Sequence, residues 1–264
     1  MNLVDVHAHL DHPLFEDDLA EVILRAKACG VVAIITQGVF HERNMKLLEL
    51  AKIDPIIKVA FGIYPLDAIN IEVNKELEAG DDYSRQSKTP FEETLDAIEQ
   101  YKDHIIAIGE VGMDFKYSAD KLGQTENFRK IIRLAKKINK PLIVHSRGAE
   151  KEVIDLLEEE QYFKVDMHCF CGSKKLLGRG AKLGLMFSIP TSVVRNQQFQ
   201  QNVEILPLGN ILTETDAPYL GPFKDIRNEP ANIKEAVLKI AEIKRMDAIE
   251  CSNAIYFNYQ KLFL

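Results

Sequence analysis

The sequence has few cysteines, and their spacing excludes two common roles. The chain has 264 residues and 4 cysteines, and no two of them form the Cys-x-x-Cys pair of a structural zinc site. Four thiols in so long a chain are also too few to indicate a disulfide scaffold. We therefore expect a protein of a reducing compartment.

Targeting signals and long apolar runs are missing as well. The N-terminus has no basic region, and its short apolar run is interrupted by Asp5 and His7, which argues against a signal peptide. No apolar stretch is long enough to span a bilayer. We expect a cytoplasmic protein with no membrane partner.

The chain also lacks an excess of positive charge. Its formal net charge is -7, so the surface as a whole does not favour a polyanion. If nucleic acid binds, local arginines and metal ions must neutralise its phosphates. The hydrophobic fraction of 46% and the charged fraction of 28% are ordinary for a globular protein.

What the sequence does contain is a regular alternation of strand-like and helix-like segments. Apolar runs predict strands at residues 3–6, 31–36, 57–63, 105–110, 141–145, 164–168, 185–189 and 211–216. Apolar residues at helical spacing predict helices at 15–30, 41–53, 91–101, 124–139, 150–160, 174–183, 193–204, 229–246 and 247–263. Continuous apolar runs are typical of strands buried on both faces.

Alternating strands and helices favour a parallel sheet, and eight units at this length favour a closed (β/α)8 TIM barrel. The alternative is an open doubly wound sheet, but no Gly-x-Gly-x-x-Gly follows the first strand. Residues 72–90 are polar and predict an exposed insertion after the third strand, with a short helix at 73–78. No linker, charge block or repeat divides the chain, so residues 1–264 are predicted to form a single domain.

Six potential metal ligands stand at the carboxyl ends of predicted strands, where barrel enzymes have their active sites. They are His7, His9, Glu110, His145, His168 and Asp216. The His-x-His pair alone is a weak motif, and an ordinary strand is the alternative. Six such residues on five strands are hard to explain by packing, because unpaired imidazoles and carboxylates are costly to bury. The pattern therefore predicts a metal site.

Six ligands are too many for one tetrahedral ion and suit two divalent cations, Mg²⁺, Mn²⁺ or Zn²⁺, that share a ligand. Glu110 is the predicted bridge, because a carboxylate has two oxygens. The remaining ligands divide into His7, His9 and Asp216 for one ion, and His145 and His168 for the other. A water or hydroxide between the ions, with its pKa lowered to about 7, is the expected nucleophile. Asp216 could accept its proton, so Asp216 and Glu110 are the candidate catalytic residues.

Several segments resemble, in order, the signatures of the TatD family. They are His7-Ala8-His9-Leu10-Asp11, Ile108-Gly109-Glu110-Val111-Gly112-Met113-Asp114, Val144-His145-Ser146-Arg147, His168-Cys169-Phe170, Glu214-Thr215-Asp216-Ala217-Pro218-Tyr219-Leu220 and Arg227-Asn228-Glu229-Pro230. The Gly-Glu-x-Gly-x-Asp and Glu-Thr-Asp-Ala-Pro segments are quite specific. The matches cover nearly the whole chain.

The resemblance implies an amidohydrolase-like barrel that hydrolyses phosphodiester bonds, because characterised members of the family are described as metal-dependent deoxyribonucleases. DNA is then the expected substrate, attacked from an end such as the 3′ end or as a single strand. Relatives in the wider superfamily often bridge two metals with a carbamylated lysine on the fourth strand, where this chain has Glu110. The sequence shows no surface for an obligate protein partner.

Two residues depart from the family's pattern. The family usually has Gly-x-His-Pro after the third strand, whereas this chain has Tyr64 in place of the histidine, so a substrate or outer contact is expected to differ. Cys171 stands where Thr or Ser is common. A small buried side chain explains this cysteine better than a redox role.

Four residues are candidate substrate contacts, and Tyr64 is one of them. Arg147 follows His145 by two residues and should face the same mouth, where its guanidinium suits a phosphate. A salt bridge is the alternative for Arg147. Arg227 and Asn228 lie in the loop after the eighth strand, and barrel loops carry function.

Two other functions are compatible with the sequence. The same ligands suit a metal-dependent amide or ester hydrolase, for example one acting on an aminoacyl bond, and the acidic net charge agrees with it. A barrel that only binds a nucleic acid or a protein is the other alternative. The complete set of ligands argues against the latter.

Overall fold

The computed structural model describes residues 1–69 and 89–264, and the sheet in this part has eight parallel strands. They are β1 (Leu3–Ala8), β2 (Val31–Gln37), β3 (Ile57–Phe61), β4 (Ala107–Gly112), β5 (Leu142–His145), β6 (Val165–Met167), β7 (Met186–Pro190) and β8 (Ile211–Glu214). Each strand pairs with the next one along the chain, from β1 to β8. All of them lie where the sequence predicts strands, with ends that differ by a few residues.

Hydrogen bonds between β1 and β8 close the sheet into a barrel. The backbone N–H of Asp216 donates to the carbonyl of His7 at 2.8 Å. Nearer the start of the two strands, Thr213 Oγ1 donates to the carbonyl of Val4 at 2.7 Å. The predicted (β/α)8 barrel is confirmed, and the open doubly wound sheet is excluded because its edge strands would not meet.

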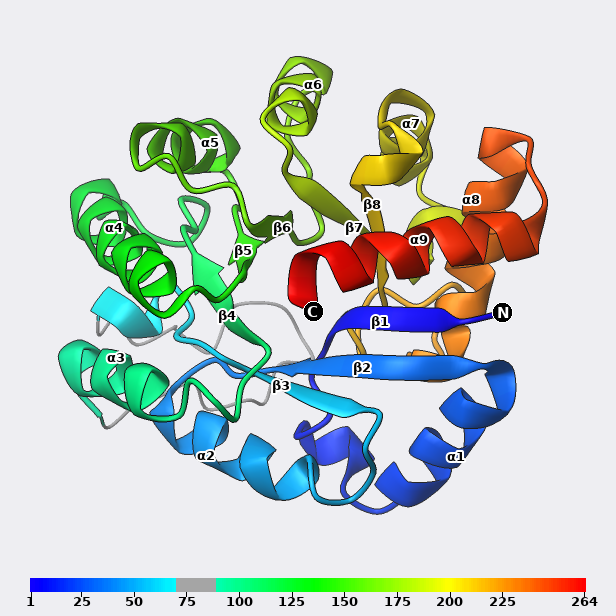
Figure 1. The fold of residues 1–264 in the computed structure, drawn as a ribbon, viewed down its shortest axis with the longest axis horizontal. Coiled ribbons are helices and arrows are strands. Elements are labelled where there is room, and N and C mark those ends of the chain that lie inside the picture. Colours follow the sequence, from blue (N-terminus) through cyan, green and yellow to red (C-terminus); the bar gives the residue numbers. More distant parts are fainter. Residues whose placement is uncertain (70–88) are drawn as a thin grey trace.

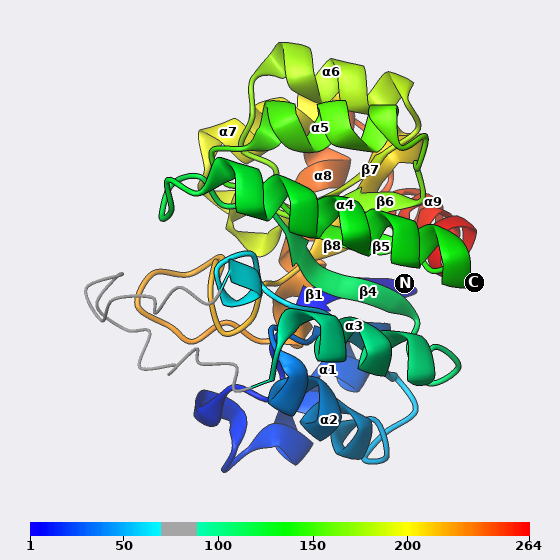
Figure 2. The same ribbon diagram turned by 90° about the vertical axis from the view of Figure 1, so that its left-hand side faces the viewer.

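The helices surround the strands, as Figure 1 shows. They are α1 (Leu19–Cys29), α2 (His41–Leu50), α3 (Phe91–Gln100), α4 (Lys121–Ile138), α5 (Glu150–Glu159), α6 (Lys174–Lys182), α7 (Gln197–Ile205), α8 (Ile233–Lys244) and α9 (Ala248–Phe263). Figure 2 shows α4 between its neighbours α3 and α5. Helices on the outside and side chains on the inside bury both faces of the strands, which explains their apolar runs.

Three helices begin later than the sequence predicts. Short 3-10 turns come before α1, α7 and α8, at Pro13–Phe15, Thr191–Val194 and Pro230–Asn232. Before α7, the side chain of Asn196 accepts a hydrogen bond from the Gln198 N–H and caps the helix. The predicted starts were wrong because one turn of 3-10 helix has nearly the same apolar spacing as the first turn of an α-helix.

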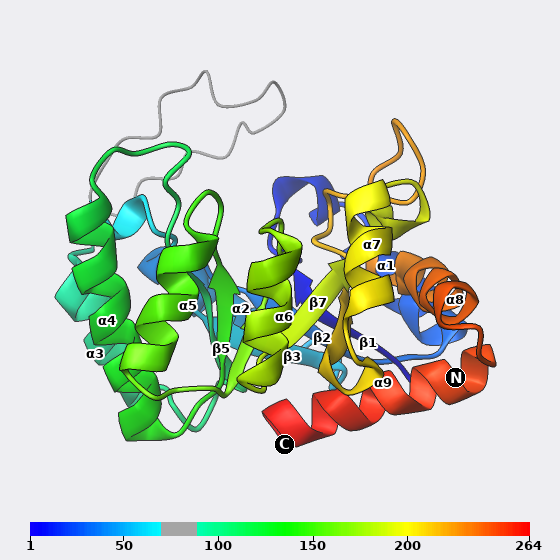
Figure 3. The same cartoon turned by 90° about the horizontal axis from the view of Figure 1, so that it is seen from above.

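Helix α9 covers the end of the barrel where the strands begin. Ser252 Oγ donates to the carbonyl of Asn2, and Asn258 Nδ2 donates to the carbonyl of Ile211, both at strand starts. Figure 3 shows α9 on one side of the barrel and the loops that follow the strands on the other. The carboxyl ends of the strands are therefore the end at which a site can open to solvent.

Most of the predicted insertion at 72–90, with its helix at 73–78, lies outside the described residues, and only Thr89 and Pro90 belong to them. In the described part of the chain, none of the helices combines the length and the apolar character needed to cross a bilayer.

Candidate active site

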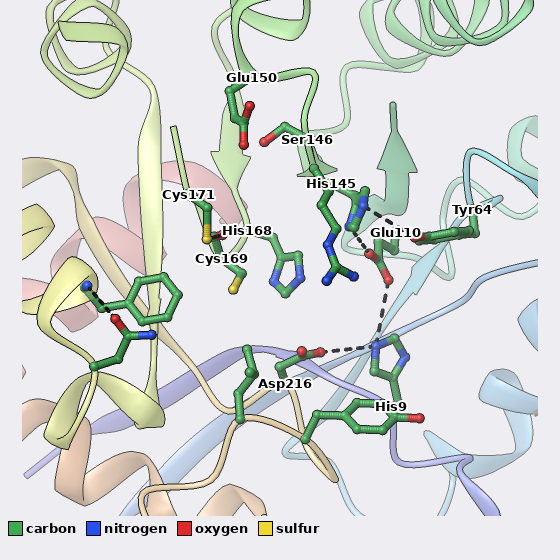
Figure 4. A pocket seen from close by; sticks show the side chains of 15 residues that line it. His9, Tyr64, Glu110, His145, Ser146, Glu150, His168, Cys169, Cys171 and Asp216 are labelled. Atoms are coloured by element: carbon green, nitrogen blue, oxygen red, sulfur yellow. Dashed lines mark hydrogen bonds and ion pairs between the residues drawn. The ribbon is translucent and has the colours of Figure 1, made fainter. Parts of the chain in front are cut away.

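The six predicted ligands converge at the carboxyl ends of the strands. They come from five strands or the residues just after them: His7 and His9 (β1), Glu110 (β4), His145 (β5), His168 (β6) and Asp216 (β8). The two histidines of the first strand are two residues apart and share a face, and their Nε2 atoms lie 3.3 Å apart. Figure 4 shows His9, Glu110, His145 and Asp216 pointing toward one another.

Glu110 stands at the centre of this cluster. Its Oε2 lies 3.7 Å from His7 Nε2 and 3.8 Å from His9 Nε2. Its Oε1 lies 3.0 Å from His145 Nδ1. The two oxygens of one carboxylate thus face two different groups of imidazoles.

The potential ligand atoms form three groups, and the atoms of each group lie within 4.8 Å of one another. They are His7, His9 and Glu110; Glu110, His145 and His168; and His7, His168 and Asp216. Asp216 Oδ1 also lies 3.4 Å from His9 Nε2. Imidazole nitrogens and carboxylate oxygens at these separations are the donor set of borderline and hard divalent cations.

Glycine is needed at two places where strands approach the site. A Cβ atom on Gly62 would lie 2.4 Å from the backbone nitrogen of Glu110, so the chain after β3 can pass only without a side chain. Gly112 has a φ of 137°, and a Cβ there would lie 2.0 Å from the carbonyl oxygen of His145. Both glycines keep β4 close to its neighbours and Glu110 in the centre.

Buried carboxylates stand behind two of the histidines. His145 Nε2 donates to Asp114 Oδ2 at 2.9 Å, and Asp114 is fully buried. His168 Nδ1 donates to Glu214 Oε2 at 2.7 Å, and Glu214 is also fully buried. Such partners fix the orientation and tautomer of a ligand histidine. The sequence reasoning missed Glu214 in this role.

Asp5 is a second residue that the sequence reasoning missed. It is fully buried and accepts hydrogen bonds from the Thr215 N–H at 2.9 Å and from Thr215 Oγ1 at 2.6 Å. Burial outweighs these bonds and raises the pKa of Asp5 to about 8. A signal for both residues was available, because Asp5 and Glu214 each lie two residues before a candidate ligand on the same strand.

Burial and neighbouring charges give the ionisable groups different protonation states. Burial, reinforced by His168, holds the pKa of His7 well below its usual range, so His7 is neutral, the form that binds metals. Burial also favours neutral His168, but Glu214 outweighs it and raises the pKa of His168 to about 10. Burial alone would raise the pKa of Glu110, yet the hydrogen bond with His145 and the imidazole charges hold it well below its usual range.

A cavity of about 400 Å³ opens over the cluster. Its lining residues are His9, Tyr64, Glu110, His145, Ser146, Arg147, Glu150, His168, Cys169, Cys171, Asn196, Phe199, Asp216, Tyr219 and Leu220. Arg147 therefore faces the mouth as the sequence predicts, and its guanidinium lies 4.9 Å from the centre of the Tyr117 ring. The volume is in the range of small-molecule sites.

Arg227 and Asn228 are not among the residues that line this cavity. Arg227 donates to both carboxylate oxygens of Asp18, at 2.8 and 2.6 Å. Asn228 is fully buried, and its Nδ2 donates to the carbonyls of Thr215 and Tyr219 at 2.8 and 2.6 Å. Both residues hold the chain after β8 in place, and their contact with a substrate stays a prediction.

The two departures from the family's pattern have clear structural contexts. Tyr64 lines the cavity, and its hydroxyl donates to Asp114 Oδ2 at 2.8 Å and lies 3.4 Å from His145 Nε2. Cys171 is exposed, so the expected small buried side chain was wrong. Its thiol donates to the Cys169 carbonyl at 3.3 Å, and the neighbouring Cys169 thiol lowers the pKa of Cys171.

A barrel with four imidazoles and two carboxylates at the carboxyl ends of its strands has the fold and site of a metal-dependent hydrolase. The sequence model described as TatD related DNase matches residues 4–264. The chain belongs to this family.

Relatives and solved structures agree with this assignment. The chain is 36% identical to deoxyribonuclease TATDN3 of Homo sapiens, covering 100% of this chain and 95% of that protein. It is 36% identical to an uncharacterized metal-dependent hydrolase of Methanocaldococcus jannaschii, over 98% of this chain and 96% of that one. The crystal structure of a TatD homologue from Escherichia coli K12 superposes with a TM-score of 0.84 at 25% identity, covering 99% and 97% of the two chains.

Proposed function

We propose that the protein is a deoxyribonuclease that hydrolyses phosphodiester bonds of DNA with two divalent cations. The observation that carries the proposal is Glu110, whose two carboxylate oxygens face two separate groups of histidines. The deoxyribonuclease name of the human relative supports DNA as the substrate.

The donor atoms divide into two sets around Glu110. His7, His9 and Asp216 would hold one cation, and His145 and His168 the other. Bound cations of this kind lower the pKa of water and neutralise charge on a phosphate. His7 is already neutral, whereas His168 must lose its proton before it can act as a ligand.

The chain's own residues supply the proton acceptor and the phosphate contact. The Asp216 carboxylate accepts the proton of the attacking water, because it lies on the cavity wall beside His9. Arg147 also lines the cavity and binds a phosphate oxygen, because a planar guanidinium can donate two hydrogen bonds. Tyr64 holds Asp114 against His145 and so fixes the direction of that imidazole.

The size of the cavity supports a proposal about the form of DNA that the protein accepts. A volume of about 400 Å³ admits one or two unpaired nucleotides, so we propose single strands or strand ends as substrates. A 3′-recessed, a 5′-recessed and a blunt duplex, compared with a single strand of the same sequence, measure this preference and the direction of attack.

Cleavage of single-stranded DNA by the purified protein tests the proposal. Activity should require Mg²⁺, Mn²⁺ or Zn²⁺ and disappear with chelator. His145→Ala removes a proposed ligand and should lower the rate of DNA cleavage at least about 100-fold. Loss of a residue that only orients a metal ligand already costs up to about this factor. His104→Ala is the matched control, because His104 is an exposed histidine outside the cavity.

Two outcomes would overturn the proposal. Intact DNA across all three metals, with hydrolysis of an amide or ester panel, would select the alternative hydrolase. Equal DNA cleavage by His145→Ala and wild type would show that the nuclease activity does not come from this cluster.

A further inference from the structure

Two thiols stand side by side on the wall of the cavity. Cys169 and Cys171 both line it, next to His168 (Figure 4). The Cys171 thiol donates a hydrogen bond to the Cys169 carbonyl oxygen at 3.3 Å. Cys171 is exposed and Cys169 is partly exposed, so a small reagent can reach them.

The backbone holds this pair in place. Cys169 has a φ of 46°, a left-handed conformation that turns the chain directly after His168. Phe170, between the two cysteines, is buried, and its ring centre lies 5.3 Å from that of Phe187. Its carbonyl accepts a hydrogen bond from Asn202 Nδ2 at 2.8 Å. The side chain of Phe170 therefore packs in the core, and the side chains of Cys169 and Cys171 line the cavity.

We propose that Cys169 and Cys171 form a dithiol that peroxide closes to an intrachain disulfide, and that closure weakens cation binding at His168. Residues two apart on a turned chain come within the Cα separation of about 4.4–6.8 Å that a disulfide needs. The other two cysteines, Cys29 and Cys251, do not line the cavity. They provide internal controls.

The chemistry balances with hydrogen peroxide as the oxidant. The Cys171 sulfur attacks one peroxide oxygen, the O–O bond breaks, and a sulfenic acid and one water form. The Cys169 sulfur then attacks the sulfur of the sulfenic acid and displaces its oxygen as a second water. Two thiols and one peroxide thus give one disulfide and two waters, and an added thiol reverses the reaction by exchange.

The link from the disulfide to cation binding runs through Glu214. This carboxylate accepts the Cys169 N–H at 3.0 Å on Oε1 and holds His168 Nδ1 at 2.7 Å on Oε2. A disulfide that moves the Cys169 backbone disturbs the carboxylate that orients the imidazole. Disturbing an outer partner of this kind costs about 10- to 100-fold in metal affinity.

The test begins with chelator-treated protein exposed to peroxide and then freed of it. We expect a loss of two free thiols, a mass lower by two hydrogen atoms, and a peptide carrying the disulfide between Cys169 and Cys171. Titration with Mn²⁺ should show at least about tenfold weaker binding, restored by dithiothreitol. Mn²⁺ is chosen because Zn²⁺ would itself bind the reduced thiols.

Variants keep the test decisive. Cys171→Ser and Cys169→Ser should each fail to lose the two hydrogen atoms, whereas Cys29→Ser and Cys251→Ser should react as wild type does. Melting temperatures show that each variant is folded. Oxygen added to Cys171 without a disulfide, a disulfide between two chains, or unchanged Mn²⁺ binding after closure would each overturn the proposal.

Discussion

On the β1–β8 side of the cluster the backbone holds the candidate ligands, whereas on the β5–β6 side buried carboxylates do. The Asp216 N–H donates to the His7 carbonyl, and Asp5 binds Thr215 between them. In contrast, Asp114 and Glu214 each bind the outer nitrogen of one histidine on the other side, His145 and His168.

His7 shows the difference most clearly, because its buried Nδ1 has no hydrogen-bond partner among the described residues. Its orientation comes from β1 and from its stacking on the His168 ring, whose centre is 3.7 Å away. Changes to the contacts that support the ligands on the β1–β8 side should therefore affect folding, whereas changes to the supporting carboxylates on the β5–β6 side should affect cation affinity and protonation.

Glu110 belongs to both sides, so changing it should have the largest effect. Glu110→Gln keeps the size of the side chain but removes the charge that faces both groups of histidines. We expect the hydrolysis rate to fall by about 100- to 10,000-fold, the range for loss of a group that takes part in the chemical step. The measurement is a rate on single-stranded DNA at saturating metal.

Glu150→Gln is the matched control for this variant. Glu150 lines the same cavity but lies outside the three groups of potential ligand atoms. A similar loss in both variants would show that the charge of the cavity matters and that a shared ligand does not.

A change behind His168 should sharpen the contrast between the two sides. Glu214→Gln removes the charge that raises the pKa of His168 to about 10. We expect about 10- to 100-fold weaker binding at one of two cation sites. On binding the cation at pH 8, the wild type should also release more protons than Glu214→Gln, because His168 of the wild type is protonated at this pH before the metal binds. Calorimetry in buffers of different ionisation enthalpy measures both quantities.

Asp114→Asn gives the parallel measurement for His145, with the same expected direction. Proton release equal to wild type in Glu214→Gln would contradict the prediction, since it would mean that Glu214 does not hold a proton on His168.

On the β1–β8 side, Thr215→Val should act on stability and leave the cations alone. It removes the hydroxyl that donates to buried Asp5 at 2.6 Å. Leaving a buried acceptor with one bond fewer costs about 1–3 kcal/mol of unfolding free energy. Urea unfolding measures this loss, and Mn²⁺ titration should give the wild-type affinity.

Thr125→Val is a suitable control, because the Thr125 hydroxyl donates to a helical carbonyl four residues earlier and otherwise meets the sulfur of Met113, a weak acceptor. Its free energy of unfolding should change by less than about 0.5 kcal/mol. Weaker cation binding in Thr215→Val, without a loss of stability, would contradict the assignment of folding to the β1–β8 contacts and of cation affinity to the β5–β6 contacts.

The sequence could bring the candidate ligands together because each one ends a strand of a recognisable barrel pattern. His7, Glu110 and Asp216 lie far apart in the chain, yet parallel strands bring their carboxyl ends to the same end of the barrel. The alternation of strands and helices is a local property that periodicity records well.

Glu214, the partner behind His168, could not be predicted in the same way. Glu214 on β8 reaches His168 after β6 across Ser188 on β7, whose Oγ lies 2.7 Å from Glu214 Oε2. That contact depends on the stagger of three strands, which no local pattern encodes. The contact of Arg227 with Asp18 could not be predicted for a related reason, since the two residues lie more than two hundred positions apart.

The smallest expected effect concerns this same pair, at the rim beside β1. The hydrogen bond from Arg227 is the main cause that lowers the pKa of Asp18 to about 2. An unfolded aspartate titrates near pH 4, so between about pH 4 and 2 the unfolded state binds more protons than the folded state. The free energy of unfolding therefore decreases as the pH is lowered through this range. The side chain is one-third exposed, at 33%, so its contribution at pH 7 should stay below about 1 kcal/mol.

Asp18→Asn should therefore be slightly less stable than wild type at pH 7, and the difference should vanish as the pH falls toward 2. Urea unfolding at a series of pH values measures it. Arg227→Lys separates the two interpretations of the arginine, because lysine keeps the charge and loses the paired hydrogen bonds to Asp18. An unchanged KM for DNA agrees with a rim contact that fastens the chain after β8 to the chain after β1. A raised KM with unchanged stability would return Arg227 to the substrate and make the β1–β8 side part of the DNA-binding surface.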